Sequence, residues 1–280
     1  MRLLVTGGTG FIGSHFIQRA IGEGNDVICL RRSGSIPKIS LTKQPKWIDG
    51  EYEDDFQDSF RNADLLVHIA SHSTNYPYDT LENCLLHNVT RPLAFLQNAK
   101  INGIQNFIII GSGFEYGLSG ENFKFIPTDA PLLPQVTYSV SKAVGSLVFA
   151  QWALQNKLKL KYLRLFHVFG EGEDESRLWP SLKRAASNGD DFKLTSGEQI
   201  RDFTNVSEIA KKILSEVKEF NVNAGETQIK NIGSNNPQSV KDFSEYWWDH
   251  WKAVGKLHFG AKPYRDDEVM RFVPDLTNSK

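Results

Sequence analysis

The chain has 280 residues and a formal net charge of −1, and 40% of its residues are hydrophobic, which is the composition of an ordinary soluble protein. This length is near the upper limit of one hydrophobic core and favours a large domain with a smaller lobe. The balanced charge and the lack of a long basic or apolar run argue against nucleic-acid and membrane partners. Cys29 and Cys84 are far apart, so we expect reduced thiols in a cytoplasmic protein. No cluster has metal-ligand spacing, and we expect no metal.

A glycine-rich turn near the start of the chain is the first functional signal. It follows the apolar run Leu3-Leu4-Val5 and precedes a segment, residues 11–21, that reads as a helix. Strand, glycine-rich turn and helix in this order predict a dinucleotide-binding loop, in which free N–H groups at the helix start hold the phosphates. The residues that we expect to contact the cofactor here are Gly7, Thr9, Gly10, Phe11, Ile12 and Gly13.

The next strand indicates which dinucleotide is bound. Residues 26–30 are a second parallel strand that ends in Arg31-Arg32. An NAD site places a carboxylate about 20 residues after the glycines, where it binds the ribose 2′-hydroxyl. Two guanidinium groups at this place suit a 2′-phosphate, to which they donate paired hydrogen bonds. We therefore predict NADP(H).

The rest of the chain alternates strands and helices. Nearly continuous apolar runs at residues 64–70, 107–110 and 160–166 are typical of parallel strands buried on both faces. Helices are predicted at residues 80–99, 135–155, 177–187 and 206–220, and in a Trp-rich segment after residue 228. The alternation predicts an α/β, doubly wound parallel sheet of the Rossmann type, made of residues 1–166 and about 200–227. Residues from about 167 to 199 and 228–280 are expected to form a small substrate-binding lobe.

The candidate catalytic residues follow the strand at 107–110, where ligands lie in such sheets. Ser112 comes directly after this strand, and Tyr138 and Lys142 stand four apart on the predicted helix 135–155, so they share one face. A lysine ammonium beside the phenol would lower its pKa, and Ser112 can bond the reacting oxygen. Together the three can protonate a carbonyl oxygen as it accepts a hydride.

At this point the sequence resembles the extended short-chain dehydrogenase/reductase family, in its nucleotide-sugar epimerase/dehydratase branch. The matching segments extend over almost the whole chain: residues 7–13 and 64–70, Asn88, Ser112 with Tyr116-Gly117, Tyr138 with Lys142, residues 164–170, residues 201–203 and residues 263–265. The resemblance implies that Ser112, Tyr138 and Lys142 are the catalytic triad and that Ile69, Ala70 and Ser71 contact the cofactor. It further implies that Arg201 and Arg265 contact the diphosphate of a nucleotide-sugar substrate, with Phe114 and His167 also at the substrate.

Two departures from the family pattern bear on the reaction. His167 stands where the family usually has an asparagine. Gly113 and Phe114 stand where dehydratases carry an Asp-Glu pair, so a 4,6-dehydratase is not expected. The favoured hypothesis is NADPH-dependent reduction of the 4-keto group of a nucleotide-activated 6-deoxyhexose, in deoxysugar biosynthesis for surface polysaccharide such as lipopolysaccharide. The alternatives are a 4-epimerase with tightly bound NAD(P) and a non-catalytic NADP-sensing protein.

Other residues have structural interpretations. His68 is expected to be a core histidine, and Asn88 to brace the sheet. Trp247, Trp248 and Trp251 lie on one helix, where core packing, a partner surface or sugar stacking could explain them. The helices with residues 85–96 and 147–154 either pair with a second subunit, giving the homodimer that similar enzymes form, or are buried in the monomer.

Overall fold

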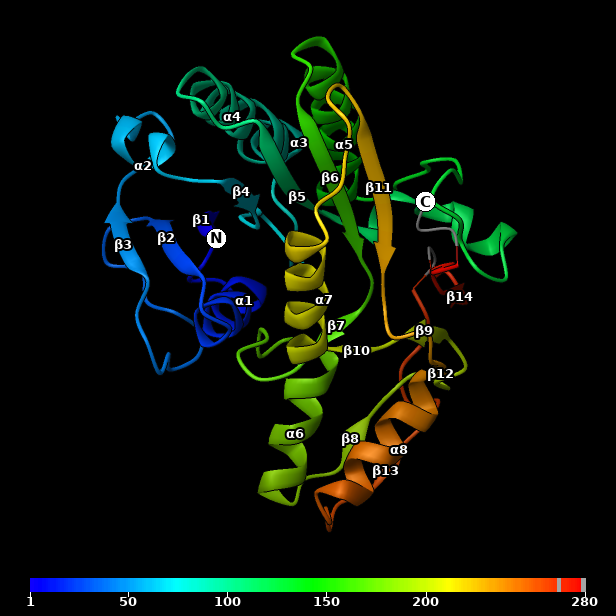
Figure 1. The fold of residues 1–280 in the computed structure, drawn as a ribbon. Helices are drawn as coiled ribbons and strands as arrows, with labels where there is room; N and C mark the ends of the chain where they lie inside the picture. The colour runs from blue at the N-terminus through cyan, green and yellow to red at the C-terminus, as the bar shows by residue number, and fades with distance from the viewer. Residues whose placement is uncertain (266–267, 278–280) are drawn as a thin grey trace.

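The computed structural model describes residues 1–265 and 268–277. Within these ranges, the chain builds a parallel sheet of seven strands in the order β3-β2-β1-β4-β5-β6-β11, which confirms the predicted doubly wound α/β class (Figure 1). The strands are β1 Arg2–Thr6, β2 Asp26–Arg31, β3 Lys46–Asp49, β4 Leu65–His68, β5 Asn106–Ser112, β6 Lys159–Leu165 and β11 Thr227–Ile232.

Helices cover both faces of this sheet because each carries an apolar stripe. On one face, α1 Phe11–Gly22 and α7 Val206–Lys218 pack their buried side chains on the strands. On the other, α2 Gln57–Arg61, α4 Arg91–Ile101 and α5 Thr137–Gln155 do the same. None of the helices in the described part of the chain is long and apolar enough to cross a membrane.

The helix predicted at residues 80–99 is divided in the structure. It consists of α3 Leu81–Leu85, a π-helical turn Leu86–Thr90 and α4. Pro92 has no amide hydrogen for the α-helical bond to the carbonyl of Asn88, so the turn before it can widen. The buried side chain of Asn88 lies in this turn and reaches the loop after β4.

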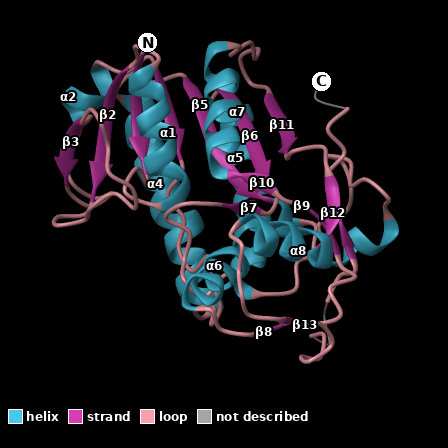
Figure 2. Cartoon of the chain, turned by 90° about the horizontal axis from the view of Figure 1, so that it is seen from below, coloured by secondary structure: helices cyan, strands magenta, loops and turns pink. Residues whose placement is uncertain are grey.

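The strand order reverses between β1 and β4, which lie side by side at the centre of the sheet. Connections from these two strands leave toward opposite sides, and a crevice opens between them at their carboxyl ends. In the view of Figure 2, α6 Leu178–Asn188 and α8 Val240–His250 lie below the arrowheads of the sheet strands.

Short strands and two helices lie below the carboxyl edge of the sheet (Figure 1). Helices α6 and α8 pack together through Leu182, Ala185 and Trp248. The strand pairs are β7 Val168–Phe169 with β10 Thr204–Asn205, β8 Phe192–Lys193 with β13 Leu257–His258, and β9 Ile200–Asp202 with both β12 Pro237–Ser239 and β14 Arg271–Phe272.

One predicted boundary of the small lobe is wrong. Residues from about 228 were expected to leave the main sheet, but β11 pairs in parallel with β6 along its whole length. Its sequence TQIKNI contains only two apolar residues, Ile229 and Ile232, because it is an edge strand, so it lacks the continuous apolar run of the central strands. The division into two lobes otherwise stays a prediction, and residues 266–267 and 278–280 of the expected lobe lie outside the described residues.

Candidate active site

A cavity of about 770 Å³ lies at the carboxyl ends of the strands, where the strand order reverses. It brings together most of the predicted site residues, which come from sequence positions as distant as the start of the chain and β6. Those that line it are Gly7, Thr9, Gly10, Phe11, Ile12, Gly13, Arg31, Arg32, Ile69, Ala70, Ser71, Ser112, Phe114, Tyr138, Lys142 and His167.

The glycine-rich loop has the close packing that a dinucleotide site requires. Gly7 has φ +76°, and a Cβ there would lie 2.4 Å from the backbone nitrogen of Ala70. A Cβ on Gly13 would lie 2.0 Å from the carbonyl oxygen of Gly7, so only glycine lets α1 begin this close to the turn. No side chain caps the start of α1 at Gly10, and its first N–H groups are available to phosphate oxygens. These residues fit a dinucleotide.

The two arginines after β2 line one end of the cavity but are not equivalent. The Arg31 Nε atom lies 2.6 Å from Asp49 Oδ1, and its guanidinium stacks 4.8 Å from the centre of the Trp47 ring. Arg32 is exposed, and no partner of its side chain is found among the described residues. Arg32 is therefore the freer cation of the two, and Lys38, in the loop after β2, also lines the cavity.

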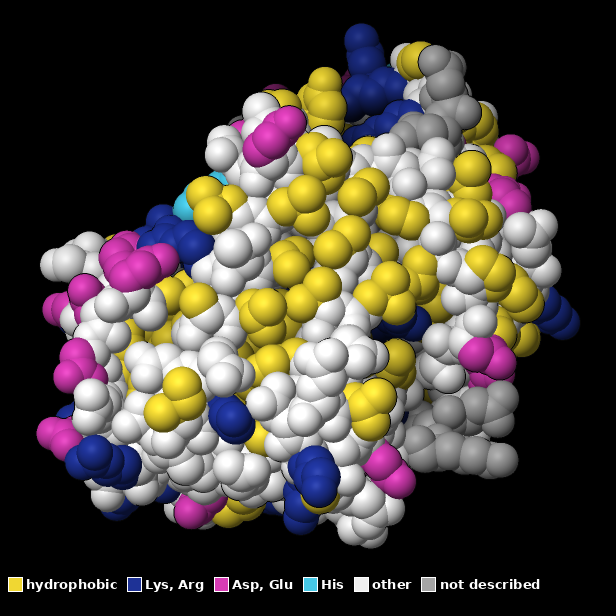
Figure 3. Space-filling view, turned by 90° about the horizontal axis from the view of Figure 1, so that it is seen from above, with side chains coloured by type: hydrophobic (Ala, Val, Ile, Leu, Met, Phe, Trp, Pro, Cys, Tyr) yellow, Lys and Arg dark blue, Asp and Glu magenta, His cyan; other side chains and the backbone are white. Residues whose placement is uncertain are grey.

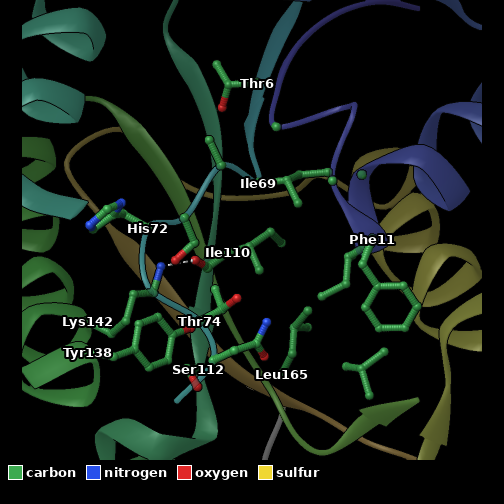
Figure 4. Close-up of a pocket in the computed structure, with 18 of the residues that line it drawn as sticks. Thr6, Phe11, Ile69, His72, Thr74, Ile110, Ser112, Tyr138, Lys142 and Leu165 are labelled. Atoms are coloured by element: carbon green, nitrogen blue, oxygen red, sulfur yellow. Dashed lines mark hydrogen bonds between the residues drawn. The ribbon is translucent and has the colours of Figure 1, made fainter. Parts of the chain in front are cut away.

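Ser112, Tyr138 and Lys142 lie next to one another on one side of the cavity (Figure 4). Ser112 ends β5, and its Oγ accepts a hydrogen bond from the Phe114 amide at 3.2 Å. Its own hydroxyl hydrogen can therefore be donated elsewhere. The side chains of Ser71 and Ser112 both hydrogen-bond the Tyr138 phenol. Lys142 donates to the carbonyl oxygen of Ile110 at 2.6 Å.

The sequence predicts that Lys142 lowers the pKa of Tyr138, but the structure gives a different result. Burial raises the pKa of Tyr138, although the hydrogen bonds from Ser71 and Ser112 oppose this effect. Burial also lowers the pKa of Lys142 to about 8, against the charge of Glu115. The physical reason is that both groups are buried and that the ammonium is bound to a strand carbonyl rather than to the phenol.

The far end of the cavity combines aromatic and charged side chains. Phe114 and Phe272 lie edge-on to the His167 ring at 5.8 and 5.9 Å between ring centres. Burial holds the pKa of His167 well below its usual range, and Arg201 and Arg177 add to this, so the imidazole is neutral. Arg177 also lines the cavity, near enough to Tyr138 to affect its pKa.

Two arginines that the resemblance places at the substrate do not line this cavity. Arg201 is buried, and its Nη2 atom lies 2.5 Å from Glu268 Oε1. Arg265 is exposed. Their contact with a diphosphate stays a prediction.

Several cavity residues were not predicted from the sequence. Glu173 and Arg177 form an ion pair at 3.5 Å, and burial raises the pKa of Glu173 to about 7. Both residues closely follow segment 167–170, which comes after a strand of the sheet. This position could have indicated that they belong to the site. Lys38 in the loop after β2, and His87 and Arg91 at the π-helical turn, also line the cavity and have no such signal.

The structural interpretation of His68 is confirmed, whereas Asn88 braces the loop after β4 and α5 rather than the sheet itself. His68 is buried, with its Nδ1 atom 2.7 Å from the Thr6 hydroxyl. The Asn88 amide bonds both backbone groups of His72 and the Ser141 hydroxyl. Of the three tryptophans, Trp248 is buried between α6 and α8, and Trp247 and Trp251 pack against the same cluster.

Sequence comparisons agree with this geometry. Residues 3–233 match the NAD dependent epimerase/dehydratase family. The chain is 26% identical to a UDP-glucose 4-epimerase of Lactobacillus helveticus, covering 100% of this chain and 90% of the relative. It is 25% identical to a CDP-abequose synthase of Salmonella muenchen (96% and 87% covered). It is 24% identical to a dTDP-6-deoxy-L-talose 4-dehydrogenase (NAD(+)) of Aggregatibacter actinomycetemcomitans (96% and 98% covered).

Comparison with solved structures supports the same fold. The crystal structure of UDP-glucose 4-epimerase from Thermotoga maritima with UDP-glucose superposes with a TM-score of 0.84 at 22% identity. The match covers 99% of this chain and 90% of that one. The seven-stranded sheet and its flanking helices are thus those of a known enzyme fold.

Proposed function

Because the chain belongs to the NAD-dependent epimerase/dehydratase family, we propose that it is an NADPH-dependent reductase of the 4-keto group of a nucleotide-activated 6-deoxyhexose. Its role would be deoxysugar biosynthesis for surface polysaccharide, in the cytoplasm. The observation that carries the proposal is the single cavity that joins the glycine-rich loop, Arg31 and Arg32 to Ser112, Tyr138 and Lys142.

The side chains at the centre of the cavity have complementary parts in such a reduction. The nicotinamide, when bound, supplies a hydride to the carbonyl carbon. Tyr138 then gives its phenolic proton to the carbonyl oxygen. The ketone has thus gained a hydride and a proton and become an alcohol. Ser112 donates its hydroxyl hydrogen to the same oxygen, in place of its hydrogen bond to the Tyr138 phenol. The ammonium of Lys142 stabilises the phenolate that remains.

The cofactor choice rests on the end of the cavity after β2. Cations line this end, and no Asp or Glu follows β2 where an NAD site would hold the ribose hydroxyls. We propose NADP(H), with Arg32 as the main ligand of the 2′-phosphate, because Arg31 is already paired with Asp49. The name of one relative gives NAD(+), so the two cofactors must be compared directly.

Reduction is favoured over dehydration by the residues after β5. Gly113 and Phe114 provide no acid to eliminate water, and the carboxylate of Glu115 is buried away from the cavity. A relative named as a 4-dehydrogenase of a dTDP-6-deoxyhexose supports redox chemistry at C4. The epimerase alternative has the support of the UDP-glucose 4-epimerase relative. The complete set of Ser112, Tyr138 and Lys142 argues against a non-catalytic sensor.

The deciding experiment incubates the protein with NADPH and a panel of 4-keto-6-deoxy nucleotide sugars. One NADPH oxidised per sugar converted supports the reductase. Conversion of a 4-hydroxy sugar to its epimer, with no net change of cofactor, would overturn it. Release of cofactor from the purified protein is a second test, since a reductase must exchange NADP(H) and an epimerase retains its dinucleotide.

We also propose that the protein forms a homodimer through α4 and α5. Leu147 and Leu154 are 66% and 57% exposed on α5, and Ile101 is 69% exposed at the end of α4. Hydrophobic side chains gather across the middle of the face seen from above (Figure 3). A second copy of this chain would present the same two helices, so each copy would cover the exposed apolar side chains of the other.

A further inference from the structure

A buried carboxylate lies directly behind the catalytic side chains. The Glu115 side chain is completely buried, and that of its partner Arg164 is 3% exposed. The two are joined by a bond of 2.8 Å between Arg164 Nε and Glu115 Oε2. Glu115 does not line the cavity, so it has no contact with a substrate or cofactor there. A charge in this position needs another explanation, because burying it is costly.

Glu115 links the two elements that carry the catalytic groups. Its Oε1 atom accepts a hydrogen bond from the backbone amide of Ser112 at 2.8 Å. The same oxygen accepts a hydrogen bond from the Tyr162 hydroxyl at 2.9 Å. The Tyr162 oxygen also lies 3.2 Å from the carbonyl oxygen of Lys142, so its one hydrogen is shared between these two acceptors. Ser112 ends β5 and Lys142 is on α5, so this one carboxylate and Tyr162 connect the turn to the helix.

The surrounding residues hold this connection rigidly. Arg164 Nη1 lies 2.8 Å from the Tyr116 hydroxyl and 3.0 Å from the carbonyl oxygen of Thr128. Tyr116 donates to Asn231 Oδ1 at 2.8 Å. A Cβ on Gly111 would lie 2.3 Å from the Tyr162 ring and 2.7 Å from Glu115 Oε1. Every polar group of the network has partners, and such a network fixes the geometry of the groups that it bonds.

The charge of Glu115 also acts on the catalytic pair. It raises the pKa of Lys142 against the effect of burial, and it adds to the raised pKa of Tyr138. The other groups near the pair are Ser71 after β4, Ser112 at the end of β5, Tyr162 on β6, Arg177 before α6 and His68 on β4. Of these, Ser71, Ser112 and Arg177 lower the pKa of Tyr138, in the opposite direction to Glu115.

We propose that Glu115 is a positioning residue that holds the Ser112 turn and the Lys142 segment of α5 at a fixed separation. A consequence of its place behind the catalytic side chains is that its negative charge acts on Tyr138 and Lys142. The role in turnover rests on the proposed function. The same charge acts on Tyr138 whether or not the right sugar is known, so the two ideas can be tested separately.

The first experiment compares the pH profile of kcat/KM for NADPH-dependent reduction in the wild type and in Glu115→Gln. Reduction needs protonated Tyr138 and Lys142, so activity is lost as pH rises through their pKa values. Removal of the negative charge should move this loss to lower pH by about one unit. The matched control is Tyr162→Phe, which breaks the link to α5 but keeps the charge. It should lower kcat and leave the pH of the loss unchanged.

The second experiment needs no sugar. The chain has 8 tyrosines, so the ionisation of Tyr138 is read as the difference in phenolate absorbance between a protein and its Tyr138→Phe counterpart after rapid alkaline mixing. The Tyr138 phenolate should form at lower pH in Glu115→Gln than in the wild type. Glu115→Gln leaves the guanidinium of Arg164 without its carboxylate partner. The double variant Glu115→Gln/Arg164→Met is therefore measured as well, and its Tyr138 phenolate should also form at lower pH than in the wild type.

An unchanged phenolate titration in both variants would overturn the proposal even if the protein proves to be a reductase. A shifted titration in a protein that reduces none of the sugars would support the role of Glu115 and count against the proposed substrate instead. A Tyr162→Phe variant whose pH profile moves as far as that of Glu115→Gln would also contradict it, because the charge would then not be the cause.

Discussion

Lys142 Nζ lies 2.6 Å from the carbonyl oxygen of Ile110, so the lysine is fixed to the end of β5 rather than to the phenol of Tyr138. Burial lowers the pKa of this ammonium to about 8. The lysine therefore carries its charge below about pH 8 and loses it as pH rises through that value. The lysine charge is then present at neutral pH but is easily removed.

The catalytic prediction concerns Tyr138→Phe. Loss of the phenolic proton should lower kcat by about 10²–10⁴-fold, the range of general acid–base catalysis, while cofactor still binds. Lys142→Ala should impair both turnover and cofactor binding. The measurements are steady-state NADPH oxidation and a cofactor titration. Near-normal turnover of Tyr138→Phe would rule this mechanism out.

The cofactor prediction distinguishes the two arginines after β2. Arg32→Ala should weaken NADPH binding by about 10–100-fold and leave NADH nearly unchanged, because a hydrogen bond to a charged group contributes about 1.5–3 kcal/mol. Arg31→Ala should affect both cofactors, since it releases Asp49 and exposes Trp47. Binding is followed by fluorescence titration. An equal loss of NADPH and NADH affinity in Arg32→Ala would contradict the proposed 2′-phosphate contact.

The central strands could be predicted because a strand buried on both faces must be apolar throughout, as in Phe107–Ile110. β11 could not, because its polar residues have partners that only the fold supplies: Lys230 pairs with Glu216 and Asn231 with Tyr116. The two- and three-residue strands of the lower part are too short to produce a periodic pattern.

The catalytic group could be predicted in part for a related reason. Tyr138 and Lys142 are four apart on one helix, so their spacing is visible in the sequence. The network behind them is not, because Glu115 meets Tyr162 and Arg164 on the neighbouring strand β6, 47 and 49 residues away in the sequence. The raised pKa of Tyr138 was equally hidden, since it depends on burial rather than on the neighbouring lysine.

A glycine prediction tests the cofactor loop. Gly13→Ala should abolish dinucleotide binding or unfold the start of α1, because its Cβ would lie 2.0 Å from the Gly7 carbonyl oxygen. The matched control is Gly22→Ala in the same helix, where a Cβ meets nothing within 4 Å. That change should be neutral or stabilise by up to about 1 kcal/mol, since alanine favours helix. The readouts are cofactor titration and thermal unfolding, and a fully functional Gly13→Ala protein would contradict the close packing.

The acid stability of the protein should depend on His68. Burial lowers the pKa of His68 from 6.5 to about 3, and the charge of Lys142 adds to this effect. The unfolded chain therefore binds a proton that the folded chain does not, and stability is lost as pH falls from about 6.5 toward 3. The slope from this group is about 1.4 kcal/mol per pH unit.

The test is urea unfolding at several pH values. His68→Gln should be less stable than the wild type at pH 7, because it disturbs the bond to Thr6, but should lose less stability on acidification. His250→Gln, at an exposed position on α8, is the control and should follow the wild type. Parallel stability curves for His68→Gln and the wild type would show that His68 has no part in the pH dependence.

The last prediction concerns the exposed leucines of α5. Leu147 and Leu154 are seven residues apart, so they lie on the same side of the helix, and both are more than half exposed. Burial of such side chains contributes about 25 cal/mol per Å² of apolar surface, which favours association through this face. Leu147→Glu/Leu154→Glu should convert a dimer into a monomer, because association through this face would bring together two new carboxylates from each copy, four in all. Leu118→Glu, at a 41% exposed position outside α5, should leave the dimer intact. Sedimentation velocity gives the mass of each protein; a monomeric wild type, or a double variant that still forms the dimer, would contradict the proposed interface.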